Sequence, residues 1–237
     1  MAERIRIQKA IAKAGLMSRR AAEEAMVEGR VLLNGEPVVL GDRVDPERDV
    51  LTVDGAPIPV REDIETHLLY KPVGIMSTAD DPQGRTTVVD LVSSEHRLYP
   101  VGRLDADSEG LILVSNDGEL TNRVTHPRFG ITKTYLAEVA GSPDRVTIRR
   151  LTEGVELEDG PARARSARLV DSQPDRALVE LVMLEGRNRE VRRMFDVVGH
   201  DVLRLVRTAI GPIKDSSLRP GESRRLSAPE IRTLLSP

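Results

Sequence analysis

The sequence predicts an α+β protein: a small N-terminal α/β module, then a larger domain with a mixed, largely antiparallel sheet flanked by helices. Residues 1–60 show two helical patterns followed by short strand patterns, and from His67 onward strand and helix patterns are interleaved. Several strand patterns alternate apolar and polar side chains, as in residues 134–139. This alternation indicates a sheet with an exposed face and favours α+β over a doubly wound parallel sheet.

The first module begins with a helix whose apolar residues, from Ile7 to Ala14, recur at helical spacing until Gly15 ends it. Ser18 is the expected N-cap of a second helix that ends at Gly29. Short strands are expected at residues 31–33, 37–39 and 50–53, with hairpin turns at 34–35 and 54–55. Residues 61–65 are polar and are interpreted as a linker.

The larger domain is expected to alternate strands and helices. The predicted strands are 66–70, 111–115, 132–139, 177–184 and 202–208, and the predicted helices are 87–92, 118–125, 144–151, 188–198 and 228–235. The sequence thus predicts two domains, at residues 1–60 and 66–237, which fits a chain of 237 residues at roughly 150 residues per domain.

The composition excludes several classes of protein. With 39% hydrophobic residues the chain can bury a core, and no apolar run approaches the roughly 18 residues of a membrane span. The N-terminal residues do not form a signal peptide. Cysteine is absent and the four histidines are widely spaced, so neither disulfides nor a metal site is expected. We expect a cytoplasmic monomer that does not bind a membrane.

The net charge of −3 conceals a basic surface near the N-terminus. Residues 1–30 carry seven basic and four acidic side chains, whereas residues 31–60 carry two and six. The expected basic face carries Arg6, Lys9, Lys13, Arg19 and Arg20. Such a face is either an ordinary solvated helix surface or a surface that binds the phosphates of a nucleic acid.

The order of residues around this face resembles the S4 RNA-binding domain. The resemblance covers about 50 residues, from Arg4 through residues 18–20 to the segment 29–35. It implies that the two helices and the following turn bind structured RNA, and that the five basic residues contact it. S4 domains occur in many different proteins, so this resemblance does not identify a reaction.

The segment 102–118 is the most informative part of the larger domain. It is a glycine-bounded acidic loop, with Asp105, Asp107 and Glu109, that leads into an apolar strand. Three interpretations are open: a solvated acidic loop, a hard-cation site that lacks the spacing of a calcium loop, and a single catalytic carboxylate supported by an arginine.

This segment, with others in the same order, resembles the RsuA-type branch of the ribosomal RNA pseudouridine synthases. The matching motifs are Gly102-Arg103-Leu104-Asp105 with residues 110–118, Tyr70-Lys71-Pro72-Val73-Gly74, Lys133-Thr134-Tyr135, residues 185–195, and the tail at 199–212. Two departures are mild, because Ser108 stands where threonine is more common and Arg192 where some relatives have lysine. With the S4 module, the resemblance covers nearly the whole chain.

The resemblance implies isomerisation of uridine to pseudouridine, which breaks the bond between C1′ and N1, turns the uracil and joins C5 to C1′. No cofactor is expected, and the target base is flipped into a pocket. Asp105 is implied as the catalytic residue, acting either on the sugar or as a base. Tyr135 is implied to stack on the uracil, and Arg192 to pair with Asp105.

Other basic residues of the motifs are expected to serve the RNA. Lys71 and Arg103 are interpreted as residues that contact the RNA backbone or order the site. Arg187, Arg189 and Arg193 crowd the start of one predicted helix and are expected to contact phosphates. Arg192 is assigned to catalysis rather than to this group.

The expected partner is ribosomal RNA or a pre-ribosomal particle. The motif at residues 187–193 resembles the large-subunit branch more than the small-subunit one, so 23S rRNA is preferred to 16S rRNA. Two further hypotheses come from other classes. One is a non-catalytic S4-type factor in ribosome assembly, and the other is a glycosidase that uses Asp105 and Asp107 as its acidic pair.

Overall fold

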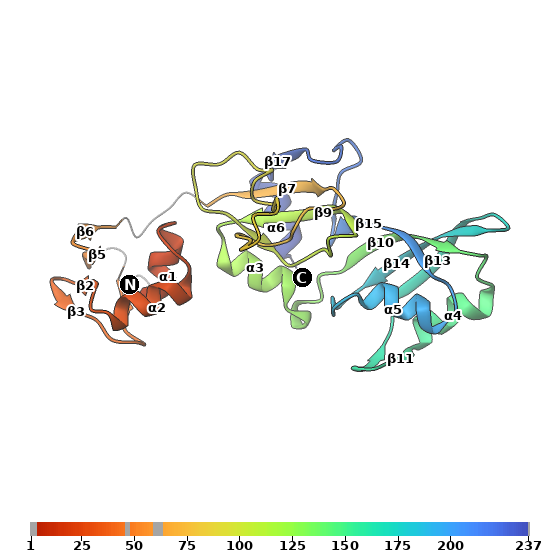
Figure 1. The fold of residues 1–237 in the computed structure, drawn as a ribbon, viewed down its shortest axis with the longest axis horizontal. Coiled ribbons are helices and arrows are strands. Elements are labelled where there is room, and N and C mark those ends of the chain that lie inside the picture. The colour runs from red at the N-terminus through yellow and green to blue at the C-terminus, as the bar shows by residue number, and fades with distance from the viewer. Residues whose placement is uncertain (1–3, 46–47, 59–63, 237) are drawn as a thin grey trace. The chain divides into compact units, whose positions relative to one another are not determined.

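The computed structural model describes residues 4–45, 48–58 and 64–236, and the chain divides into two compact units (Figure 1). One unit comprises Met1–Glu65 with Ser94–Leu98, and the other comprises Thr66–Ser93 with Tyr99–Pro237. Residues 61–63 of the expected linker lie outside the described residues.

In the first unit, two short helices pack against short strands. The elements are β1 (Ile5–Arg6), α1 (Ile7–Lys13), α2 (Arg19–Val27), β2 (Val31–Leu33), β3 (Glu36–Pro37), β4 (Arg43–Val44), β5 (Leu51–Val53) and β6 (Ala56–Pro57). The Ser18 hydroxyl accepts a hydrogen bond from the Ala21 amide at 3.2 Å, which confirms the expected N-cap. The strands pair in the order β3-β2-β5-β6, with β1 beside β4, over a core that includes Ile7, Ile11 and Leu51.

The second unit is built on a sheet of nine strands among its described residues. Its path is β13-β14-β10-β15-β9-β7-β17, with β16 on β15 and β8 on β9. The strands are β7 (Thr66–Lys71), β8 (Tyr99–Val101), β9 (Glu109–Ser115), β10 (Lys133–Ala140), β13 (Ser166–Ser172), β14 (Arg176–Met183), β15 (Val202–Ile210), β16 (Ile213–Lys214) and β17 (Ser223–Arg225), and a separate hairpin joins β11 (Val155–Leu157) to β12 (Gly160–Ala162).

Only one pair of neighbouring strands in this sheet, β9 and β15, is parallel among the described residues. Their register places Gly110 opposite Arg207. Gly110 has a φ of +107°, and a Cβ there would lie 2.3 Å from the Arg207 carbonyl oxygen. Only glycine permits this close approach, which joins the two antiparallel halves of the sheet. The predicted mixed, largely antiparallel sheet is therefore confirmed.

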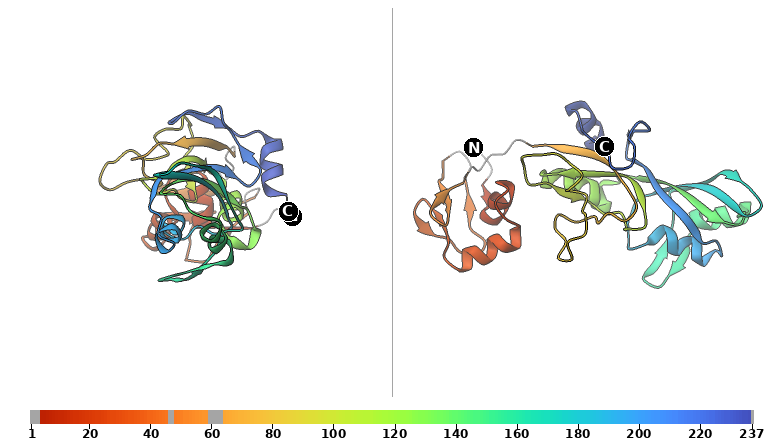
Figure 2. Two further views of the ribbon diagram at one scale, coloured as in Figure 1. Left: turned by 90° about the vertical axis from the view of Figure 1, so that its right-hand side faces the viewer. Right: turned by 45° about the horizontal axis from the view of Figure 1, so that its top comes forward.

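The helices of the second unit cover the sheet in two groups (Figures 1 and 2). They are α3 (Gly118–Thr125), α4 (Arg145–Glu153), α5 (Glu190–Val197) and α6 (Ala228–Leu235), with a short 3-10 turn at Pro127–Phe129. Leu120 of α3 and Leu234 of α6 share a buried cluster with Leu68 and Leu113. The helix α4 packs on β13, and α5 packs on β11 and β15.

The helix expected at residues 87–92 is absent, and this prediction was wrong. The segment forms turns in which the Asp90 carboxylate accepts hydrogen bonds from the Thr87 amide, at 2.7 Å, and from the Thr87 hydroxyl. A carboxylate that bonds the local backbone competes with helix formation, and six residues cannot offset the cost of helix nucleation. The expected strand at residues 37–39 was also too long, since β3 ends at Pro37.

We predict that Gly110→Ala destabilises the protein far more than Gly160→Ala. Both glycines have nearly the same φ, +107° and +105°, so both substitutions introduce similar backbone strain. Only at Gly110 does the new Cβ meet backbone, whereas nothing lies within 4 Å at Gly160. The expected difference in the free energy of unfolding is about 3 kcal/mol, measurable by urea denaturation. Equal destabilisation would contradict the close approach of β9 and β15.

Candidate active site

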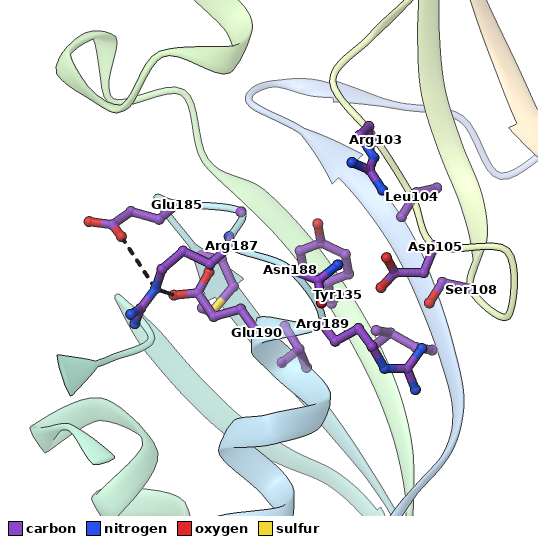
Figure 3. Close-up of a pocket in the computed structure, with 14 residues that line it drawn as sticks. Arg103, Leu104, Asp105, Ser108, Tyr135, Glu185, Arg187, Asn188, Arg189 and Glu190 are labelled. Carbon is purple, nitrogen blue, oxygen red and sulfur yellow. Dashed lines mark hydrogen bonds and ion pairs between the residues drawn. The ribbon is translucent and has the colours of Figure 1, made fainter. Parts of the chain in front are cut away.

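A pocket of about 130 Å³ opens beside the loop that joins β8 to β9 (Figure 3). Its walls come from that loop, from β10, β14 and β15, and from the segment that precedes α5 and the start of that helix. The lining residues are Arg103, Leu104, Asp105, Ser108, Tyr135, Met183, Glu185, Gly186, Arg187, Asn188, Arg189, Glu190, Val191 and Leu205. The sheet thus brings together sequence motifs that are separated by up to about 100 residues.

Three buried cations hold the loop by its carbonyl oxygens. Lys71 donates to the Ser108 carbonyl at 2.8 Å, and Arg192 donates to the Asp107 carbonyl at 3.0 Å. Arg207 bridges the two ends, donating to the Arg103 carbonyl at 3.2 Å and to the Leu111 carbonyl at 2.6 Å. Hydrogen bonds from charged groups are among the strong ones, so the backbone around Asp105 is firmly fixed.

A neighbouring segment adds a second set of contacts to the same loop. The Gly74 amide donates to the Ala106 carbonyl at 2.7 Å. The Ser77 hydroxyl donates to the Leu104 carbonyl at 2.7 Å and accepts from the Leu104 amide at 3.1 Å. The residues on both sides of Asp105 are thereby fixed through their main chain.

The Asp105 side chain makes no hydrogen bond or ion pair within the part of the chain that the structure describes. Its carboxylate is directed toward the ring of Tyr135 (Figure 3). Tyr135 is 8% exposed and points inward from β10, as the alternation of that strand predicts. A free carboxylate on a rigid loop therefore faces an aromatic ring across the pocket.

Arg192 does not pair with Asp105 in this structure, contrary to the prediction. Its Nε lies 3.4 Å from the Asp107 carboxylate, and its two Nη atoms donate to the carbonyls of Asp107 and Val202. Asp107 also accepts from Arg189 at 2.9 Å. Burial would raise the pKa of Asp107, but the hydrogen bond from Arg189 and the charge of Arg192 outweigh it and lower that pKa.

The other arginines around α5 also have carboxylate partners. Arg193 holds Asp159, in the β11–β12 turn, with two bonds of 2.8 and 3.1 Å. Arg187 donates to Asp159 at 3.1 Å and to Glu190 at 3.2 Å. The expected crowding of cations is relieved by these carboxylates, and Arg187 and Arg193 fasten the β11–β12 hairpin to the start of α5.

Lys71 is completely buried, which excludes the predicted contact with the RNA backbone. Its position supports the alternative prediction that it orders the site. Burial lowers the pKa of Lys71 to about 8, against the attraction of Asp105 and Asp107. The lysine thus places a positive charge behind the loop that carries Asp105.

The five basic residues expected to bind RNA in the first unit are accessible. Arg6, Arg19 and Arg20 are exposed, and Lys9 and Lys13 are partly exposed. None of the five forms an ion pair with a described carboxylate. They remain available to an external anion.

Sequence reasoning missed Arg207, although a signal was present. In β15 the buried positions alternate through Leu205, Arg207 and Ala209, so a charged residue occupies an inward-facing position of a strand. An arginine at such a position needs buried acceptors, which here are the carbonyls at both ends of the loop.

Within the described residues, no cluster of His, Cys, Asp or Glu suits a metal ion, and no helix is long and apolar enough to cross a membrane.

Comparison with known proteins defines the class to which this fold and pocket belong. The family model for RNA pseudouridylate synthase matches residues 65–196, and that for the S4 domain matches residues 5–50. A crystal structure of a pseudouridylate synthase superposes with a TM-score of 0.68 at 32% identity, over 97% of this chain and 99% of that one. The chain therefore belongs to the RNA pseudouridine synthase family, with an N-terminal S4 domain, and it is an isomerase.

Two curated relatives place the chain within the family more narrowly. Ribosomal large subunit pseudouridine synthase B of Bacillus subtilis is 42% identical over 233 residues, covering 97% of this chain and 95% of the relative. An uncharacterised RNA pseudouridine synthase of Mycobacterium leprae is 46% identical over 235 residues, covering 97% and 92%. The predicted RsuA-type family and its S4 domain are confirmed.

We predict that Lys71 and Lys133 lose their protons near pH 8. Burial disfavours the charged form of both, and Arg207 lowers the pKa of Lys133 further, so both have a pKa of about 8. The chain has five lysines, so ¹³Cε NMR of lysine-labelled protein resolves each one. Lys71→Met and Lys133→Met should each remove one resonance that titrates near pH 8. Retention of both titrations in either variant would contradict the assignment.

Proposed function

We propose that the enzyme converts uridine to pseudouridine in ribosomal RNA, namely 23S rRNA, with Asp105 as the catalytic carboxylate. The observation that carries the proposal is the free Asp105 side chain that faces Tyr135 across the pocket (Figure 3). In a site where nearly every other charged group has a partner, this carboxylate is left for the substrate. Residues 66–237 form the catalytic domain in this proposal, and residues 1–60 form the RNA-binding domain.

The pocket has the size of a single ring. Its volume of about 130 Å³ is close to the 150 Å³ or so of an engineered cavity that binds benzene. A pyrimidine base is of similar size, and a base inside folded RNA must leave its stack to reach such a pocket. Tyr135 supplies the aromatic plane on which the flipped uracil stacks, and Val191 lines another wall.

The reaction requires no group beyond those of the protein and the nucleotide. The bond between C1′ and N1 breaks, the uracil turns within the pocket, and a bond forms between C5 and C1′. N1 gains a proton and C5 loses one, so no atom is gained or lost overall. Asp105 acts at the reacting nucleotide, and Tyr135 keeps the detached uracil in the pocket. The rigid loop supports this role because it limits the motion of the carboxylate relative to the base.

The other candidate functions have less support. Asp107 binds Arg189 and Arg192, so it is not free to act as the second acid of a glycosidase. A pocket with a free carboxylate favours an enzyme over a purely structural assembly factor. The relative from B. subtilis is named for the large ribosomal subunit, which supports 23S rRNA over 16S rRNA. An rRNA substrate places the reaction in the cytoplasm, and the exposed cations of the S4 domain support RNA as the partner.

We predict that Asp105→Asn lowers the rate of pseudouridine formation by at least about a thousandfold while RNA affinity stays within about twofold. The amide keeps the size of the side chain but cannot act as nucleophile or base. Purified wild type and variant are incubated with a 23S rRNA transcript, and pseudouridine is quantified by mass spectrometry. Asp171→Asn, on the exposed edge strand β13, is the matched control and should retain full activity. An active Asp105→Asn enzyme would refute the role of Asp105.

We predict that deletion of the gene removes a pseudouridine from 23S rRNA and none from 16S rRNA. Pseudouridines are mapped in both RNAs from the deletion strain and from the parent. Complementation with the wild-type gene should restore the lost site, and complementation with the Asp105→Asn gene should not. Loss of a pseudouridine from 16S rRNA instead would contradict the proposed 23S substrate and identify the small-subunit rRNA as the substrate.

A further inference from the structure

A second hollow, of about 200 Å³, adjoins the pocket and shares four of its lining residues. The shared residues are Arg103, Tyr135, Glu185 and Gly186. Beyond them the hollow is lined by the end of α3, the start of β10 and the middle of β15. Any nucleotide whose base stacks on Tyr135 therefore has this hollow next to it.

Three cations line this hollow, and none has a described carboxylate partner. Lys133 donates to the carbonyls of Val124 and Ile131 at 2.8 and 2.9 Å, and Arg207 donates to the carbonyls of Arg103 and Leu111. The Nη2 atom of Arg207 is buried and has no hydrogen-bond partner in the described structure. The exposed side chain of Arg103 likewise has no hydrogen-bond partner among the described residues, and it lines the pocket (Figure 3).

This arrangement differs from that of two arginines of α5 near the site. Arg192 has Asp107 beside it, and Arg193 has Asp159. Carbonyl oxygens hold Lys133 and Arg207 in place but carry no net charge, and Arg207 is only 4% exposed. Burial of a cation without an anion is costly. The lowered pKa of Lys133, caused by burial and by Arg207, agrees with that cost.

The carboxylate of Glu185 does not neutralise this cluster. Its side chain is 57% exposed on the rim of the hollow, and its contact is with Arg187 at 4.0 Å. The hollow therefore has an excess of positive charge where the RNA backbone would enter. The anionic group of RNA is the phosphodiester, and each nucleoside in a chain is flanked by two of them.

We propose that the hollow lined by Arg103, Lys133 and Arg207 binds a backbone phosphate that flanks the flipped uridine. Arg103 and Lys133 contact the phosphate, and Arg207 acts from behind through its charge. This inference rests on the proposed function for the identity of the nucleoside, but the anion site is defined by the cations alone. The phosphate would fix the ribose between the two hollows and so present its C1′ to Asp105.

The anion site is tested without any reaction by titrating the lysine-labelled protein with inorganic phosphate. The Lys133 ¹³Cε resonance should shift with phosphate and its titration should move to higher pH, because a bound anion stabilises the charged amine. The Lys214 resonance is the internal control, since Lys214 is exposed on β16 and lines neither hollow. A Lys133 resonance that does not respond would overturn the proposal.

Nucleotide binding identifies which phosphate is held. Dissociation constants are measured by NMR for uridine, uridine 5′-monophosphate and uridine 3′-monophosphate. One of the two phosphorylated forms should bind about tenfold more tightly than uridine. Lys133→Met and Arg103→Gln should each remove that preference, and Lys214→Met should retain it. Arg103→Gln alters an exposed side chain and does not threaten the fold, so it decides the outcome if Lys133→Met unfolds.

Failure of this proposal is distinguishable from failure of the proposed function. A wild-type enzyme that forms pseudouridine but shows no preference for a phosphorylated nucleotide overturns the phosphate site alone. An inactive wild-type protein whose Lys133 resonance responds to phosphate retains the anion site and overturns the assigned reaction. With an active enzyme, Lys133→Met should raise KM for the rRNA transcript about tenfold, change kcat less than threefold, and reduce the slope of log KM against log salt concentration by about one.

Discussion

The site depends on the way buried cations fasten one loop by its main chain. Lys71, Arg192 and Arg207 each donate to carbonyl oxygens of residues 103–111 and not to the carboxylate of Asp105. A direct ion pair would have consumed the lone pairs that a substrate needs. Because these cations donate their hydrogen bonds to backbone carbonyls, they fix the position of Asp105 and still place positive charge near its carboxylate. The loop is therefore fixed by its main chain while the Asp105 carboxylate stays unpartnered, which is the combination that its proposed catalytic role requires.

The topology of the sheet makes this fastening possible. The parallel contact between β9 and β15 brings Arg207 beside the end of the loop, and the antiparallel pair β7–β9 brings Lys71 to the same place. Gly110 lies at the junction, and its missing side chain allows the backbone of β15 to approach. A larger residue would separate the strands and withdraw Arg207 from the Arg103 carbonyl. The pairing of the strands thus determines the geometry of the loop, and the loop in turn shapes the pocket.

The sequence predicted regular structure well because periodicity and capping are local properties. The alternation predicted for residues 134–139 and the predicted Ser18 cap are both found in the structure. The helix expected at residues 87–92 failed because the Asp90 side chain bonds the local backbone, a competition that apolar spacing does not reveal. The carboxylate with which each arginine pairs was the least predictable feature of the site. Motif order placed Arg192 near the loop, but the preference for Asp107 over Asp105 depends on side-chain positions a few ångströms apart that only the packed fold determines.

The small net charge of the protein has a structural meaning. Most arginines around the site are neutralised by carboxylates, as Arg193 is by Asp159, and these pairs hold the hairpin and helix that enclose the pocket. Among the described residues, the cations near the pocket that lack such partners line the hollow beside Tyr135, and the basic face of the S4 domain is likewise left without carboxylate partners. A uniformly basic surface would bind any RNA by counterion release. Neutralising most arginines around the pocket leaves fewer sites there at which a phosphate can bind, so in the proposed function these ion pairs contribute to selection of the substrate as well as to the stability of the fold.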